Sequence, residues 1–227
     1  MRRLATGLFL TLCAVLVAAP RTAQAQQLLI DYAGFDFEDP NPDPGVFGEL
    51  GSGYVGVGEV LGVHAPLVAN FTDNAYTYFI SGATAINRQD FGDYVIVDYG
   101  TGTLSIYEDS KSGGTAAVYG QNPPNATSPS TFIDGTLILQ GTLSSFQVVF
   151  SVLSNAGSYE GRLDLTGGSQ FPSIPEDQRQ GWTFSGFTGN ATNIEPGYVH
   201  QVAGQVNLNL PTPARIASWG NLKARYR

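Results

Sequence analysis

The sequence predicts an all-β fold, and three observations carry this prediction. Charged residues make up only 13% of the chain, while 28 glycines and 11 tyrosines are typical of many strands joined by tight turns. Apolar and polar residues alternate through several segments, as they do on a half-buried strand. Pro, Asn, Ser and Gly gather between these segments. We therefore expect a single β-sandwich or jelly roll of about ten mostly antiparallel strands, followed by a short C-terminal amphipathic helix or tail.

The expected strands follow from this alternation. Residues 146–152 place four apolar side chains on one face and mostly polar ones on the other, while residues 93–99 are apolar on both faces apart from their acidic positions, which fits a central strand. Residues 100–102 form a glycine-rich turn that predicts a hairpin between 93–99 and 103–108. The expected strands are 28–37, 54–63, 75–80, 93–99, 103–108, 115–119, 136–140, 146–152, 159–165, 182–187 and 202–210.

The first 25 residues have the layout of a secretory signal peptide. A basic start at Arg2 and Arg3 precedes an apolar run over 8–19, and small residues at Ala23 and Ala25 fit cleavage after Ala25. The apolar run is too short to cross a bilayer, and no later segment approaches the roughly 20 apolar residues that a transmembrane helix needs. We expect export to the periplasm, the cell surface or the extracellular space.

Charge and cysteine content exclude several kinds of chemistry for the expected mature chain. Removing the leader takes away three arginines and leaves 8 basic against 19 acidic residues, a net charge of -11. Residues 26–110 hold 13 acidic residues and one basic residue. Such an acidic chain disfavours nucleic-acid binding. Cys13, the only cysteine, lies in the leader, which excludes disulfides and cysteine-bound metals from the mature protein.

Proline marks the expected end of the β domain. Irregular segments are expected at 39–45, 120–131 and 167–181, where Pro, Asn, Ser and Gly cluster. The domain itself is expected over 26–210, and the Pro-Thr-Pro linker at 211–214 ends it because proline cannot continue a central strand. Residues 215–227 carry apolar side chains every three or four positions among four basic ones, which predicts a basic amphipathic tail.

An acidic segment after the first expected strand is a candidate calcium site. Its oxygen-bearing side chains are those that hard cations prefer, and they are Asp36, Asp39, Asn41, Asp43 and Glu49. The spacing departs from a helical calcium loop because Pro44 follows the third ligand where glycine is wanted. Two interpretations stay open, a calcium-ordered loop and a solvated acidic turn. No cofactor is required by any other motif.

The sequence assigns no catalytic residue. It contains neither a Gly-x-Ser-x-Gly nor a His-Glu-x-x-His motif, and its two histidines, His64 and His200, are far apart in the chain. Glu160 and Asp164 share a strand face, but Arg162 between them is typical of an exposed row of charges. A non-catalytic binding or structural domain is the main hypothesis. A carbohydrate-active enzyme whose carboxylates are assembled only by the fold is the alternative.

Aromatic residues are candidates for a ligand-binding face. Tyr76 and Tyr78 share one strand face, and Trp182 begins another expected strand. Sugar-binding sandwiches stack ligands on such rings, so a glycan or another envelope protein is the expected partner, although the same rings would also serve as core. A small outer-membrane β-barrel is the third hypothesis, because alternating strands also fit a lipid-facing wall.

The end of the chain resembles a known kind of tail. The residues Trp219, Leu222, Lys223 and Tyr226 stand in the segment Trp-Gly-Asn-Leu-Lys-Ala-Arg-Tyr-Arg. This segment resembles the short W-G-x-[IL]-K-x-x-[YF]-R tails that end many uncharacterised exported bacterial proteins. Counted with the residues from Pro211 that lead into it, the resemblance covers about 15 of 227 residues. The resemblance implies a bacterial envelope protein with a terminal sorting or attachment element, held noncovalently in a partner groove.

Overall fold

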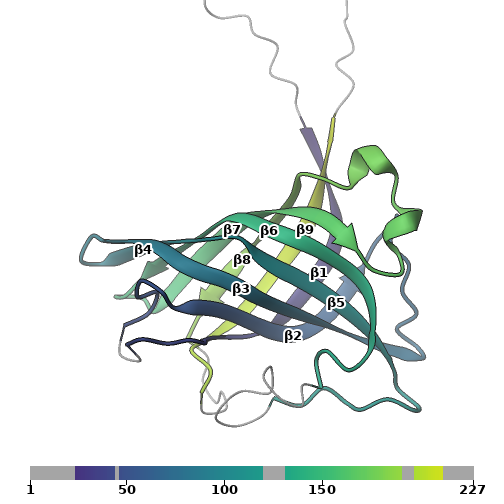
Figure 1. Ribbon diagram of the computed structural model, residues 1–227, viewed down its shortest axis with the longest axis horizontal. Coiled ribbons are helices and arrows are strands. Elements are labelled where there is room, and N and C mark those ends of the chain that lie inside the picture. Colours follow the sequence, from purple (N-terminus) through teal and green to yellow (C-terminus); the bar gives the residue numbers. More distant parts are fainter. Residues whose placement is uncertain (1–23, 44–45, 120–130, 191–196, 212–227) are drawn as a thin grey trace, which may run out of the picture. The chain divides into compact units, whose positions relative to one another are not determined.

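The computed structural model describes residues 24–43, 46–119, 131–190 and 197–211 (Figure 1). The chain divides into two units, of which Gln26–Asn209 is the folded domain. The second unit combines Met1–Ala25 with Leu210–Arg227. The expected signal peptide, apart from its last two residues, and the tail residues Trp219, Leu222, Lys223 and Tyr226 lie outside the described residues. No helix in the described part is long and apolar enough to cross a membrane.

The domain is an antiparallel β-barrel. Its strands are β1 (Gln24–Glu38), β2 (Gly53–Val63), β3 (Asn74–Asp90), β4 (Tyr94–Tyr99), β5 (Gly102–Ser110), β6 (Thr136–Ser151), β7 (Ala156–Gly167), β8 (Trp182–Gly189) and β9 (His200–Pro211). Two 3-10 helices, η1 (Phe171–Ser173) and η2 (Glu176–Gln178), lie between β7 and β8. Sequential strands pair side by side around the sheet, and β9 hydrogen-bonds to β1, so the sheet closes on itself.

The expected hairpin at residues 100–102 is wrong. Both β4 and β5 pair with β3 on one side and with β6 on the other. Tyr99 pairs with Ala85 and Thr103 with Ser81, so the two strands follow one another along one line (Figure 1). The turn-like glycines interrupt a single long strand. The nine strands therefore fill eight positions around the barrel.

The expected sandwich or jelly roll is corrected by this closure. All-β class and antiparallel pairing are confirmed, but the fold is one closed barrel, because β1 and β9 pair across the whole length of the chain. Two expected strands, 136–140 and 146–152, are halves of β6 with a register shift between them. Residues 115–119 form no strand. Tyr119 packs instead against Phe35 on the outside of β1, with ring centroids 4.8 Å apart.

Aromatic side chains fill the barrel interior. Tyr54 and Tyr99 each lie about 5 Å from Phe146, and Phe184 stacks on Tyr32 at 5.4 Å. The hydroxyls of Tyr32 and Tyr159 share a 2.8 Å hydrogen bond across the barrel. Among the largest fully buried side chains are five interior residues, Trp182, Tyr54, Tyr78, Phe146 and Phe184. The interior is therefore a packed core.

Two pairs of facing glycines make room for these rings. Gly34 pairs with Gly58 between β1 and β2, and a Cβ at Gly58 would lie 2.6 Å from Cε1 of Tyr78. Gly186 pairs with Gly204 between β8 and β9, and a Cβ at either would collide with the phenol of Tyr159. In both places a tyrosine from the adjacent strand lies over two glycines. The absence of a side chain is what lets the wall approach the ring so closely.

The outer wall has two different surfaces. Over β1 and β2 it carries an apolar cluster in which Phe37, Val55 and Val57 pack against Phe132 and Tyr198 from the loops. The outward residues of β7 and β9 are mostly polar, and they include Ser158, Glu160, Arg162, Asp164, Gln201, Gln205, Asn207 and Asn209. The first surface is covered by the chain itself, and the second faces solvent.

Candidate functional site

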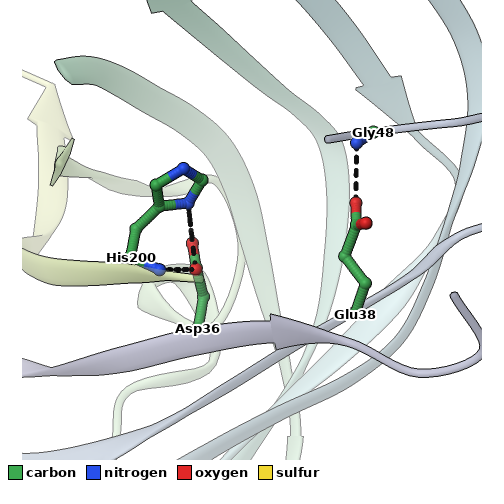
Figure 2. A network of polar contacts seen from close by, with 4 residues as sticks. All are labelled: Asp36, Glu38, Gly48 and His200. Atoms are coloured by element: carbon green, nitrogen blue, oxygen red, sulfur yellow. Dashed lines mark hydrogen bonds and ion pairs between the residues drawn. The ribbon is translucent and has the colours of Figure 1, made fainter. Parts of the chain in front are cut away.

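A buried acid and histidine join the two strands that close the barrel. Asp36 on β1 and His200 on β9 are both about 3% exposed. Nδ1 of His200 lies 3.1 Å from Oδ1 of Asp36, and the His200 backbone N–H donates to the same oxygen at 2.9 Å (Figure 2). The ring also packs between Phe47 and Phe150, with centroids 4.8 and 4.6 Å away. Asp36 is therefore held by the backbone and the ring of His200, and the two phenylalanines hold that ring in place.

Glu38 points to the same side of β1 as Asp36 and anchors the loop between β1 and β2 (Figure 2). The backbone N–H of Gly48 donates to Oε1 of Glu38 at 2.7 Å. Gly48 also lies against Val97 inside the barrel, so the loop closes this end. The pKa of Glu38 is raised to about 7, mainly by burial and also by nearby Asp36, while the Gly48 hydrogen bond, His200 and Ser52 oppose the shift.

This arrangement predicts a pH-dependent stability. Because the pKa of Glu38 is about 7 when folded and ordinarily 4.5, the folded chain holds the proton more tightly. The stabilisation is complete below about pH 4.5 and is lost as the pH rises through 7. We expect it to be worth ~2 kcal/mol, after allowing for the partial contact of the carboxyl with water. Glu38→Gln keeps an oxygen that accepts from Gly48 but cannot ionise.

Urea unfolding between pH 5 and pH 8 measures this effect. The wild-type chain should lose ~2 kcal/mol more than Glu38→Gln over that range. Glu49→Gln, in the same loop, is the matched control and should follow the wild type. An equal pH dependence in wild type and Glu38→Gln would show that Glu38 does not titrate between the folded and unfolded states in this range.

The predicted calcium ligands do not gather in the structure. Asp36 points into the barrel and is engaged by His200, whereas Asp39, Asn41 and Asp43 lie in the loop outside it, as does Glu49. Among the described residues, no three His, Cys, Asp or Glu side chains are placed to hold a metal ion. Calcium binding by this loop stays a prediction.

The predicted ligand-binding aromatics are buried. Tyr78 and Trp182 lie in the barrel interior, and Tyr76 is buried near its end, where its hydroxyl donates to Oε1 of Glu108 at 2.9 Å. A stacking platform needs an exposed ring face. Their placement therefore favours the core role that the sequence left open, and ligand binding by these three residues is not tested.

The outer wall carries a hollow of about 1010 Å³, which we call the outer groove. Its lining includes small residues at the middle of β7, β8 and β9, namely Ser158, Ser185, Gly186, Ala203 and Gly204. Larger side chains also line it, including Gln147, Glu160, Phe187 and Gln205. The groove forms because the small side chains make its floor and the larger side chains around them make its walls. The glycines that accommodate the interior tyrosines thus also lower the outer floor.

Phe187 gives the groove an exposed aromatic ring. It is 75% exposed, although it lies on a strand, and it pairs with Ser158 and Ala203, whose small side chains leave the ring uncovered. One row further along the strands, Gln147, Glu160 and Gln205 lie at the same level on β6, β7 and β9. An apolar row and a polar row therefore run side by side across the wall.

Sequence reasoning missed this groove but contained one signal for it. In β8 the buried positions are Trp182, Phe184 and Thr188, so strict alternation turns Phe187 toward water. The exposed ring becomes informative through the hollow beside it. The neighbouring floor could not be inferred, because it depends on which strands pair. Comparison with protein-family models, curated proteins and solved structures finds no match to this chain.

Proposed function

We propose that this chain is an exported, non-catalytic β-barrel module that binds glycans on its outer wall. The observation that carries the proposal is the outer groove, where an exposed ring lies beside amide and carboxylate groups. Sugar rings have apolar C–H faces that stack on aromatic side chains, and their hydroxyls hydrogen-bond to amides and carboxylates. Phe187 supplies the first kind of contact, and Gln147, Glu160 and Gln205 supply the second.

The interior supports a binding role more than an enzymatic one. Asp36 and Glu38 are two carboxylates that the fold brings together inside the barrel, and the raised pKa of Glu38 would suit a general acid. Both are occupied, Asp36 by His200 and Glu38 by Gly48. None of these residues lines the outer groove, the hollow beside Tyr76 or the hollow beside Asp98. A carbohydrate-active enzyme would need substrate space beside these carboxylates.

The distribution of polar residues supports a barrel surrounded by water. A transmembrane barrel turns apolar residues toward lipid and polar residues inward. Here the interior is aromatic and aliphatic, and the outward residues of β7 and β9 are mostly polar. Export rests on the layout of the first 25 residues. Attachment to the envelope rests on the resemblance of the tail, and both belong to the proposal.

A glycan array followed by titration calorimetry on the full mature chain tests the proposal. Phe187→Ala should weaken binding of any glycan hit about tenfold, the loss expected for one stacked ring worth ~1.4 kcal/mol. Leu153→Ala is the matched control, since Leu153 is 82% exposed in the turn after β6 and does not line the groove. An array without hits, or a Phe187→Ala variant that binds like the wild type, would contradict glycan binding at this groove.

A further inference from the structure

A polar ladder crosses the barrel wall through the outer groove. Five outward side chains on five neighbouring strands are paired directly, and they are Asp98, Gln147, Glu160, Ser185 and Gln205 on β4, β6, β7, β8 and β9. Neighbouring strands lie about 4.8 Å apart, so the ladder measures about 19 Å along the wall. This is longer than one sugar ring. A ligand that used the whole ladder would be a chain lying across the strands.

A second hollow extends the groove along this ladder. It has a volume of about 450 Å³ and includes Asp98 in its lining. Gln147 and Glu160 line both hollows, so the two are contiguous. The second hollow lies where β4 ends and β6 shifts its register, beside Gly100 and Ser145. The interrupted strand therefore lengthens the surface available to a ligand.

The ladder is pre-organised at its β4 end. Nε2 of Gln147 donates to Oδ1 of Asp98 at 2.6 Å, and Nδ2 of Asn87 donates to Oδ2 at 2.8 Å. These two hydrogen bonds lower the pKa of Asp98, so its carboxylate stays charged. Both amides are fixed in orientation, and their carbonyl oxygens remain acceptors for ligand donors.

The charge of the two hollows is negative. Asp31, Asp98 and Glu160 line them, and neither lining contains a lysine, arginine or histidine. Arg162 follows Glu160 on the same face of β7, but its guanidinium lies beside Gly181. Asp31 lies 3.6 Å from Nε2 of His64, whereas no lysine, arginine or histidine in the linings faces Asp98 or Glu160. An anionic polymer would meet these two carboxylates without a compensating cation.

We propose that the two hollows form one binding trench for a linear glycan that carries no acid groups and is bound more tightly when it carries free amines. This inference rests on the proposed glycan binding and adds the length and charge of the ligand. The apolar row beside the ladder, Ile96, Val149 and Phe187, contacts the sugar faces. The ladder receives their hydroxyl and amino groups.

Calorimetry with glucosamine oligomers of one to six units tests the proposal. We expect affinity to rise at least tenfold from the monomer to the tetramer, and oligomers of uronic acids to bind at least tenfold more weakly than glucosamine oligomers. Glu160→Gln should reduce affinity for the amino form several-fold more than it reduces affinity for the N-acetylated form, because only the amino form loses a charge partner. Glu176→Gln, on η2 and exposed, is the control and should leave both unchanged.

The outcomes separate this inference from the proposed function. Equal affinity for monomer and hexamer, or tight binding of uronic-acid oligomers, would overturn the trench. A third result would also overturn the trench. The array would give glycan hits whose binding Phe187→Ala weakens, but no oligomer of glucosamine or N-acetylglucosamine would bind the chain. If no glycan of any kind bound the chain, the proposed function itself would be wrong.

Discussion

Gly58→Ala should destabilise the barrel by ~3 kcal/mol or more, a large loss for one added methyl group. A Cβ at this position would collide with the carbonyl oxygen of Ala33 and lie 2.6 and 2.7 Å from Cε1 of Tyr78 and Cα of Gly34. Backbone atoms of a paired strand cannot move aside as the end of a flexible side chain can. The strands would have to separate or Tyr78 would have to leave the core.

Thermal unfolding with Gly62→Ala as control measures this effect. Gly62 lies on the same strand, but a Cβ there would meet only the flexible side chains of Asp31, at 3.1 Å, and His64. Gly58→Ala should lower the midpoint by about 6 to 12 °C or prevent folding, whereas Gly62→Ala should change it by only a few degrees. Similar midpoints for the two variants would show that the glycine and tyrosine packing does not limit stability.

Asp36→Ala should cost about 3 to 5 kcal/mol, because it leaves buried polar groups of His200 without their acceptor. The carboxylate accepts from the His200 backbone at 2.9 Å and lies 3.1 Å from Nδ1, and both residues are almost fully buried. The double variant Asp36→Ala, His200→Leu removes the orphaned ring as well. It should therefore be no less stable than Asp36→Ala alone.

Denaturant unfolding of the wild type, the two single variants and the double variant forms a cycle that isolates the pair. His200→Leu alone should also be strongly destabilised, because it leaves a buried carboxylate with less compensation. Strictly additive losses would mean that Asp36 and His200 do not stabilise each other, and that each loss comes from packing alone.

The strands could be predicted from the sequence, but their closure could not. Alternation in 202–210 and 146–152 depends only on which side of a strand is wet, so a sandwich and a barrel produce the same pattern. Closure depends on β1 meeting β9, a contact between the two ends of the domain. The wrong prediction of a hairpin at residues 100–102 has a related cause. Two glycines in three residues are typical of a turn, yet they also permit an interruption within a strand.

The sites were harder to predict than the strands for the same physical reason. The sequence places Asp36 in a candidate calcium loop because other oxygen ligands follow it closely, whereas its partner in the structure, His200, is 164 residues away in sequence. The outer groove depends on small residues contributed by three strands. Local spacing carries no information about such a surface. The alternation of apolar and polar residues in β8 predicts only that Phe187 is exposed.

Closure of the sheet also bears on how this chain avoids aggregation. An open sheet leaves two strands with unpaired backbone groups, and proteins usually protect such edges with lysine, proline or bulges. This sequence has two lysines, and the domain Gln26–Asn209 contains one of them, Lys111. Pairing between β1 and β9 removes both edges at once. If these strands separated, two long edges would become available to other copies of the chain. We therefore expect the buried pair of Asp36 and His200 at this junction to oppose self-association as well.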